Sequence, residues 1–267
     1  MTEAAPAAVQ TDGVTCDVVD GIATLTLDRP QRFNTLTSEV IAALSAHLAA
    51  LAASDEARVV ILAATGKAFC TGHDLKEMNA QRDAAFYRRL LADCSRMMQA
   101  IVALPQPVIA QVQGIATAAG CQLVATCDMA VAAASARFAT NGIQNGLYCA
   151  TPAVALSRVV PRKHALEMLL TGDFISAARA AAIGLVNHVV DDEALATETR
   201  ALAARIAEKS HFAVRLGKAT YYRKSDQGLD TPYRAAAEDL VCNLMSADGQ
   251  EGIDAFIEKR KPTWRDQ

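Results

Sequence analysis

The chain has 267 residues, of which 52% are hydrophobic, and it carries a formal net charge of −3. This length and apolar content can bury a sizeable core as one large domain, or one domain with an appendage, and they exclude disorder of the whole chain. The small charge and the dispersed basic residues exclude a global attraction to nucleic acid, and no apolar run reaches the ~18–20 residues that a membrane span requires.

The seven cysteines are scattered along the chain and lie mostly in apolar segments. An odd number in such surroundings predicts reduced core thiols instead of a disulfide framework. The first residues also lack the basic and apolar regions of a secretory signal. We therefore expect a soluble protein in a reducing compartment, the cytosol or an organelle matrix, and assign it to the cytoplasm. No group of residues has the spacing of a zinc site, so neither a metal nor a covalently bound cofactor is expected.

The N-terminal half reads as strands that alternate with helices. Residues 1–13 are expected to form a mobile tail, because they are rich in Ala, Pro and Thr without periodicity. Two alternating apolar runs meet at Asp20-Gly21, which predicts a β-hairpin because glycine adopts the positive φ of a tight turn. Thr37 is the predicted N-cap of an amphipathic helix within residues 37–57. Buried strands are predicted at 58–64, 107–114 and 128–134.

This alternation predicts an α/β architecture with a core over residues 14–200. From about residue 163 the pattern becomes almost entirely helical, with segments that end at Gly172 and Gly184. Amphipathic, Ala-rich helices of this kind are typical of packing and subunit contact. A helical C-terminal region is therefore expected over residues 201–267.

Two stretches run from a strand through a glycine turn into a helix: "GKAFCTGHDLKEM" (66–78) and "GIATAAGCQLVATCD" (114–128). Such a turn leaves backbone N–H groups unpaired and aimed outward, where they can bind an anion or a developing oxyanion. Asp74 and Glu77 fit the start of a helix through its dipole, so their expected role is capping. The spacing of the glycines matches neither a dinucleotide fingerprint, nor a P-loop, nor a serine-hydrolase elbow.

These turns, with three further stretches, resemble the crotonase (enoyl-CoA hydratase/isomerase) superfamily. The further stretches are "LTLDRPQRFNTLT" (25–37), "LTGDFISAARAAAIGLVNHVV" (170–190) and "DGQEGIDAFIEKRKPTW" (248–264). The resemblance implies a spiral of ββα units with a helical C-terminal oligomerisation region, assembled as a homotrimer or a dimer of trimers. It also implies an acyl-CoA thioester as ligand, with coenzyme A as part of the substrate. The backbone amides of His73 and Ala119 would then polarise the thioester carbonyl, a contribution of ~3–4 kcal/mol each in comparable sites.

The sequence departs from the family at two positions. Hydratases of the family use two glutamates to add water across the double bond, and here those positions hold Gln122 and Gly142. Neither residue can exchange a proton at neutral pH, so general acid–base catalysis of ~10²–10⁴-fold is not supplied in the usual way. The segment 146–169 resembles a divergent branch, the enoyl-CoA hydratase domain-containing protein 3 group, which also lacks the pair. Residues that could substitute are His73, Asn141, Tyr148, Cys149 and Thr151, although Cys149 also fits a buried thiol and Tyr148 a packing residue.

Contacts to coenzyme A follow from the same resemblance. The positions that match the nucleotide end are Gln31, Arg32 and Phe33, and those that match the pantetheine and thioester are Thr71, Asp74 and Leu75. Asn141 is also expected to bind the substrate, and Lys259 or Lys261 of a neighbouring subunit would meet a phosphate. Two kinds of function stay open. One is an enzyme on acyl-CoA, a hydratase, an isomerase or a thioester hydrolase with a substitute base; the other is a non-catalytic acyl-CoA binder or assembly partner. Restoring glutamate at both positions 122 and 142 is expected to introduce hydration if the pocket is intact.

Overall fold

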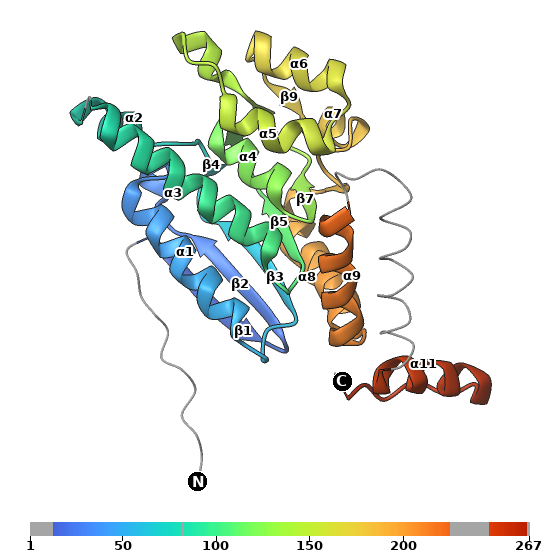
Figure 1. The fold of residues 1–267 in the computed structure, drawn as a ribbon. Coiled ribbons are helices and arrows are strands. Elements are labelled where there is room, and N and C mark those ends of the chain that lie inside the picture. The colour runs from blue at the N-terminus through green and yellow to red at the C-terminus, as the bar shows by residue number, and fades with distance from the viewer. Residues whose placement is uncertain (1–12, 82, 225–245, 266–267) are drawn as a thin grey trace.

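The strands form two sheets in the part of the chain that the computed structural model describes, residues 13–81, 83–224 and 246–265 (Figure 1). The larger sheet has the order β1-β2-β3-β5-β7-β10 and the smaller sheet the order β4-β6-β8-β9. The members of the larger sheet are β1 (Val14–Val19), β2 (Ile22–Leu27), β3 (Val59–Ala64), β5 (Val108–Val112), β7 (Met129–Ala133) and β10 (His188–Val190). Those of the smaller sheet are β4 (Ala68–Cys70), β6 (Ile115–Thr117), β8 (Arg137–Ala139) and β9 (Ile175–Ser176).

The chain winds between the two sheets as a spiral. Consecutive strands β3 and β4, β5 and β6, and β7 and β8 are divided between the larger and the smaller sheet, and helices lead from each pair to the next. Strands β2, β3, β5, β7 and β10 pair in parallel, as do β4, β6 and β8. Parallel strands covered on both faces read as continuous apolar runs, which explains why "VVILAA" in β3 is almost wholly buried. The predicted α/β class and the ββα spiral are confirmed.

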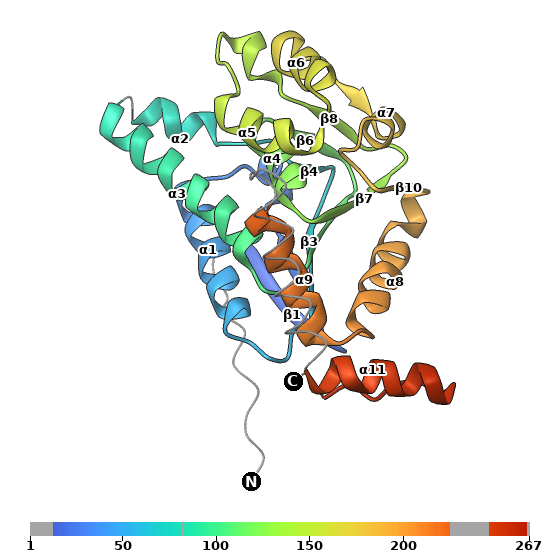
Figure 2. The same ribbon diagram turned by 45° about the vertical axis from the view of Figure 1, so that its right-hand side comes forward.

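The local signals at the N-terminus form the predicted elements. Asp20 and Gly21, with φ of 53° and 74°, make the turn of the β1–β2 hairpin. Thr37 caps α1 (Ser38–Ala52) by accepting a hydrogen bond of 3.2 Å from the N–H of Val40. Figure 2 shows α1 and α3 (Ala84–Ala103) on one side of the larger sheet, while α8 (Leu195–Ala207) lies on the other, against β3, β5 and β7.

The remaining helices continue the spiral and then extend from it. They are α2 (Leu75–Ala80), α4 (Ala119–Thr126), α5 (Ala150–Val159), α6 (Arg162–Thr171), α7 (Ala177–Ala182), α9 (His211–Lys224) and α11 (Ala247–Glu258), with short 3₁₀ turns at Pro30–Arg32, Asn141–Asn145 and Asp192–Ala194. Gly172 ends α6 in the left-handed conformation, as predicted. The expected boundary between residues 200 and 201 falls inside α8, and the expected tail lies outside the described residues except for Gly13. None of the described helices has the length and apolar character to cross a membrane.

Helix α9 is fixed to the spiral by a buried ion pair. The Nζ of Lys218 lies 2.7 Å from Oδ2 of Asp128 and donates at 3.0 Å to the carbonyls of Ile101 and Gln106. The hydroxyl of Tyr222 donates to the other carboxylate oxygen at 2.8 Å. Burial lowers the pKa of Lys218, although the adjoining Asp128 partly offsets this effect. The cluster joins α9 to the end of α3 and to the α4–β7 corner.

Candidate active site

The first turn, between β4 and α2, presents the backbone N–H of His73. The residues before and after His73 are both hydrogen-bonded to Leu36. The N–H of Leu36 donates to the carbonyl of Gly72 at 2.8 Å, and the N–H of Asp74 donates to the carbonyl of Leu36 at 3.2 Å. Between them, the N–H of His73 has no hydrogen-bond partner among the described residues. Gly72 has a φ of 83°, which glycine adopts without the steric cost of a side chain.

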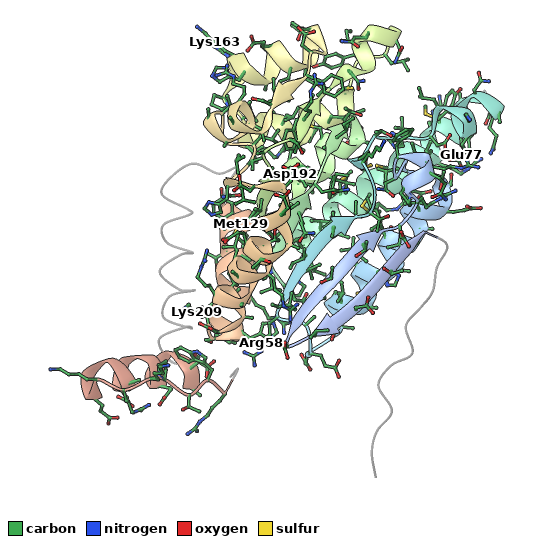
Figure 3. All side chains as sticks on the ribbon, turned by 180° about the vertical axis from the view of Figure 1, so that it is seen from behind. Arg58, Glu77, Met129, Lys163, Asp192 and Lys209 are labelled. Carbon is green, nitrogen blue, oxygen red and sulfur yellow. The ribbon has the colours of Figure 1, made fainter. Side chains whose placement is uncertain are left out.

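Asp74 caps α2 and joins it to the loop that precedes α1. One carboxylate oxygen accepts from the N–H groups of Lys76 and Glu77 at 2.9 and 3.2 Å, and the other accepts from the Thr35 hydroxyl at 3.1 Å. Burial raises the pKa of Asp74, but these hydrogen bonds and the Arg32 guanidinium, 3.7 Å away, together hold it below its ordinary value. Glu77 projects from α2 toward the start of α1 (Figure 3), where it accepts from the N–H of Ser38. Both acids therefore serve as caps.

The second turn, between β6 and α4, presents the N–H of Ala119. Ala118 has φ 50° and ψ −120°, a conformation that side chains disfavour. Strain of this kind persists only where the surroundings impose it, and it is characteristic of functional sites. Ala119 is the first residue of α4, and its N–H has no partner among the described residues, whereas the preceding N–H donates to Ala139. The turn thus leaves an unpaired amide at the positive end of a helix.

The two turns meet. A Cβ added at Gly72 would lie 3.1 Å from the amide nitrogen of Ala119 and 2.9 Å from the Cβ of Ala118. A Cβ added at Gly120 would lie 1.9 Å from the carbonyl oxygen of Cys70, so α4 packs backbone to backbone on the end of β4. These approaches bring Gly72, the residue that precedes His73, against the amide nitrogen of Ala119. Two N–H donors side by side suit a single carbonyl oxygen that gains negative charge.

The imidazole of His73 lies in a half-buried position beside this pair. Its Nε2 is enclosed and has no hydrogen-bond partner among the described residues. Burial lowers the pKa of His73 below its ordinary value, and the charge of Glu77 opposes this only in part. The side chain is therefore neutral at neutral pH, and a neutral imidazole nitrogen can accept a proton.

Gln122 lies one turn into α4, on the helix face of Ala119. Its side chain is buried, and Oε1 has no hydrogen-bond partner among the described residues. The residue lines a cleft of about 1340 Å³ that α4 shares with α3, α5 and α9. Thr126, Met98 and Val154 line the same cleft, as does Met129, which Figure 3 labels.

At the second glutamate position the backbone leaves no room for a side chain. A Cβ on Gly142 would lie 2.6 Å from the carbonyl oxygen of Leu147 and 2.8 Å from Sγ of Cys149. Restoring a glutamate here therefore requires the 147–149 segment to move, and this bears on the condition of an intact pocket under which the paired substitution is expected to introduce hydration. Burial raises the pKa of the Cys149 thiol, and the N–H of Gly142 lowers it only in part. Tyr148 beside it is 48% exposed. A thiol held protonated is a weak nucleophile.

The residues expected to contact the substrate include one group near the first turn and others apart from it: Asn141 begins the Asn141–Asn145 turn, and Lys259 and Lys261 follow α11. The N–H of Thr71 donates to the carbonyl of Phe33 at 3.2 Å, and Arg32 reaches Asp74, so the Pro30–Arg32 turn lies against the first turn. Phe33 and Leu75 are both more than half exposed there. Lys259 follows α11, which lies well away from α4 in Figure 1, so one chain does not bring it to the other residues.

Several features of the site have no sequence signal of their own. The strain at Ala118 and the contact at Gly72 arise only when the two turns meet, and the cleft wall on α9 comes from a segment remote in the chain. Asn34 carries a weaker signal, as a polar residue in the loop before α1. Its side-chain amide donates to the carbonyls of Thr65 and Ala68 and holds this loop on the β3–β4 connection. Within the described ranges, no three His, Cys, Asp or Glu residues are grouped as metal ligands.

Comparison with known proteins finds a matching family model, similar sequences and similar solved structures. The family model described as Enoyl-CoA hydratase/isomerase matches residues 17–267. The chain is 46% identical to the human mitochondrial enoyl-CoA hydratase domain-containing protein 3 over 246 residues, which cover 92% of this chain and 81% of that protein. The crystal structure of an enoyl-CoA hydratase from Mycobacterium smegmatis superposes with a TM-score of 0.93 at 50% identity, covering 94% of this chain and 98% of that one. The structure of the human domain-containing protein 3 gives a TM-score of 0.92 at 45% identity, over 94% of this chain and all of the other.

The predicted cytoplasmic location is contradicted by these relatives, because the rat, mouse and human proteins are named mitochondrial. The prediction depended on unpaired cysteines, which indicate a reducing compartment, and the cytosol and an organelle matrix share that property. The resemblance of the motifs, by contrast, is confirmed along almost the whole chain. The chain belongs to the enoyl-CoA hydratase/isomerase family.

Proposed function

We propose that this protein binds acyl-CoA thioesters, with the thioester carbonyl oxygen held between the backbone N–H groups of His73 and Ala119. One observation carries the proposal: two turns that pack against each other each leave a backbone N–H unpaired among the described residues, and one of these groups lies next to a strained residue. Polar backbone groups in a folded protein are nearly always paired, so two neighbouring free donors call for an acceptor from a ligand.

The surroundings support one orientation of the ligand. Coenzyme A lies along Gln31, Arg32 and Phe33 and along the Thr71–Leu75 turn, where Phe33 and Leu75 offer exposed apolar surface and Arg32 a positive charge. The acyl group extends past Gln122 into the cleft beside α4. The apolar wall formed there by Met98 and Val154 suits a hydrocarbon chain.

Binding without hydration is the role that the side chains favour. Gln122 cannot exchange protons, Gly142 has no space for a carboxylate, and Cys149 is held as a thiol. The second candidate is an isomerisation in which His73 moves a proton on the acyl chain. It is supported by the unpartnered Nε2 and the lowered pKa of this imidazole. The amide pair would stabilise the enolate that such a transfer forms.

Assembly as a homotrimer or a dimer of trimers belongs to the proposal. Exposed apolar side chains on α6, Leu166 and Leu170, offer surface for contacts between subunits. In such an assembly Lys259 of a neighbouring subunit would meet a phosphate of coenzyme A. Sedimentation velocity on the purified chain tests this part separately.

Removal of a single backbone N–H tests the central claim. Proline is tolerated at the first residue of a helix, and Ala119 holds that position in α4. Because φ 50° and ψ −120° at Ala118 disfavour a following proline, binding is compared only after circular dichroism shows that the variant has the wild-type spectrum and melting temperature. Ala119→Pro is expected to weaken butyryl-CoA binding by about tenfold or more in calorimetry, since it removes one donor and fills its place. Ala84→Pro, at the first position of α3, is the matched control and should bind as the wild type does.

Equal binding by Ala119→Pro and the wild type would refute the carbonyl site. An assay with crotonyl-CoA separates the catalytic readings: turnover above ~1 s⁻¹, an ordinary value for an enzyme, would exclude binding without hydration. Conversion of a 3-enoyl to a 2-enoyl thioester that is lost in His73→Gln would support the isomerase candidate.

A further inference from the structure

Asn34 is a buried side-chain amide in the loop between β2 and α1, and it binds main-chain groups on both sides of that loop. The residue is 1% exposed. Its Oδ1 accepts from the N–H of Arg29 at 2.8 Å, and its Nδ2 donates to the carbonyls of Thr65 and Ala68 at 2.9 and 2.8 Å. A buried amide that is paired at both its oxygen and its nitrogen has one fixed orientation. Asn34 therefore holds the loop in one position against the β3–β4 connection.

The backbone at this position explains why the residue is an asparagine. Phe33 and Asn34 have φ of 50° and 52°, so two successive residues adopt the left-handed conformation. Asparagine enters this region more readily than most other residues with a side chain. The carbonyl of Phe33 and the N–H of Leu36, on either side of Asn34 in the chain, both bind the first turn of the candidate site.

The hydrogen bonds from this loop surround the unpaired N–H of His73. The N–H and the hydroxyl of Thr71 donate to the carbonyl of Phe33 at 3.2 and 3.3 Å. Leu36 binds the residues directly before and after His73, through its N–H at 2.8 Å and its carbonyl at 3.2 Å. The direction of the His73 N–H thus depends on the loop, and the position of the loop depends on Asn34.

The other donor of the proposed carbonyl site, at the start of α4, has separate supports. The N–H of Ala118 donates to the carbonyl of Ala139 at 3.0 Å, and Gly120 packs on the carbonyl of Cys70. Neither contact involves the loop before α1. A change at Asn34 should therefore misdirect one of the two N–H groups and leave the other in place.

We infer that Asn34 is a positioning residue for the thioester carbonyl, because its side-chain amide aligns the N–H of His73 through the loop of residues 33–36. The inference rests on the proposed function, which gives that N–H its acceptor. Asn34 is too deeply buried to reach the ligand, so its effect passes through the loop. The same loop carries Phe33, which is expected to contact coenzyme A, so a test must separate the carbonyl from the rest of the ligand.

Two ligands that differ only at the carbonyl make this separation. Butyryl-CoA has the thioester carbonyl, and the thioether S-butyl-CoA has a methylene group in its place. The ratio of their dissociation constants in calorimetry cancels the contacts of coenzyme A. With two N–H donors, the wild type should prefer butyryl-CoA by about tenfold. Asn34→Gly keeps the left-handed backbone and removes the side-chain hydrogen bonds, so the preference should fall to about threefold or less.

A second variant and a spectroscopic measurement keep the test independent of Asn34→Gly. Asn34→Asp keeps the size of the side chain and the acceptor for Arg29, and it removes both donors, so its preference should fall as well. Isotope-edited infrared spectroscopy at saturation follows the C=O stretch of bound butyryl-CoA. Its frequency should be higher in both variants than in the wild type, because a misdirected N–H polarises the carbonyl less.

Gln106→Ala is the matched control for a general loss of stability. Gln106 is also a buried amide, and its Nε2 donates to the carbonyls of Leu51 and Ser54 at 2.8 and 3.2 Å, at the C-terminal end of α1. Removing it should lower the melting temperature, as the Asn34 variants do, because two buried carbonyls lose their partner. Its preference for butyryl-CoA and its C=O frequency should equal those of the wild type.

The outcomes distinguish this inference from the proposed function. If the wild type shows no preference for butyryl-CoA over S-butyl-CoA, the proposed function fails and the inference fails with it. If the wild type has the preference and the Asn34 variants retain it, acyl-CoA binding stands and the inference is overturned, even where both ligands bind more weakly. An equal fall in Gln106→Ala would also overturn it, since lost stability would then be the cause. A fall confined to the Asn34 variants supports the positioning role.

Discussion

Replacing Ala118 by glycine should stabilise this protein, although the same change elsewhere in a fold destabilises it. Ala118 has φ 50° and ψ −120° at the entrance of α4. A non-glycine residue in such a region costs ~1–3 kcal/mol, and glycine adopts it without that cost. Two losses of stability reduce this gain. The greater freedom of glycine in the unfolded chain costs ~0.4–1 kcal/mol, and removing a half-buried methyl group from the folded protein costs ~0.4 kcal/mol. The balance is a gain of about 1 kcal/mol in the free energy of unfolding.

Guanidinium unfolding followed by circular dichroism measures this balance, and the melting temperature should rise by ~2–4 °C. Ala116→Gly is the matched control: Ala116 lies in β6, is fully buried and has an ordinary φ. Losing a whole buried methyl and adding backbone freedom should cost about 1.5 kcal/mol there. If Ala118→Gly unfolds as early as Ala116→Gly, the turn is unstrained, and the argument that strain aims the Ala119 amide fails.

Three further predictions concern other parts of the molecule. The double variant Gln122→Glu with Gly142→Glu should gain no hydration of crotonyl-CoA and lose ~1–3 kcal/mol of stability, because the Cβ at 142 collides with the Leu147 carbonyl; a gain in turnover would contradict the packing. The lowered pKa of His73 means that the unfolded chain binds a proton near pH 6.5 while the folded chain does not, so stability falls as the pH drops below that value. His73→Gln should flatten the change in melting temperature between about pH 7 and pH 5.5, and an unaltered slope would exclude His73 as its source. Lys218→Met leaves Asp128 buried without its cation and should cost ~3–5 kcal/mol in guanidinium unfolding; a loss below ~1 kcal/mol would show that α9 is held by apolar packing alone.

Much of the fold follows from local signals in the sequence. The β1–β2 turn at Asp20-Gly21, the Thr37 cap of α1 and the buried run of β3 each satisfy a rule that operates within a few neighbouring residues. Strands β4, β6 and β8 were not predicted as separate elements. Each is only three residues long, which is too short for a strand to be recognised from alternating hydrophobicity. Their pairing depends on the winding of the chain between the two sheets.

The candidate site, too, was predicted from the sequence only in part. The sequence indicated which two turns carry free amides, because glycine and a helix start recur in each. It gave no sign that a side chain at 142 would meet Leu147 and Cys149, since that contact arises from the fold of the 142–149 segment. Nor did it indicate that α9 closes the cleft, because Lys218 and Asp128 are ninety positions apart and their pairing is a tertiary contact.

The approach of Gly120 to the carbonyl of Cys70 has a consequence for how this protein can change. That junction is made by main-chain atoms. Replacing the surrounding side chains should therefore leave the spacing of the two turns unchanged. Side chains on the outer faces of the two turns can be exchanged while this junction keeps its dimensions. Under the function proposed above, the scaffold therefore separates binding a thioester from transforming it, and a lineage that loses the second ability can retain the first.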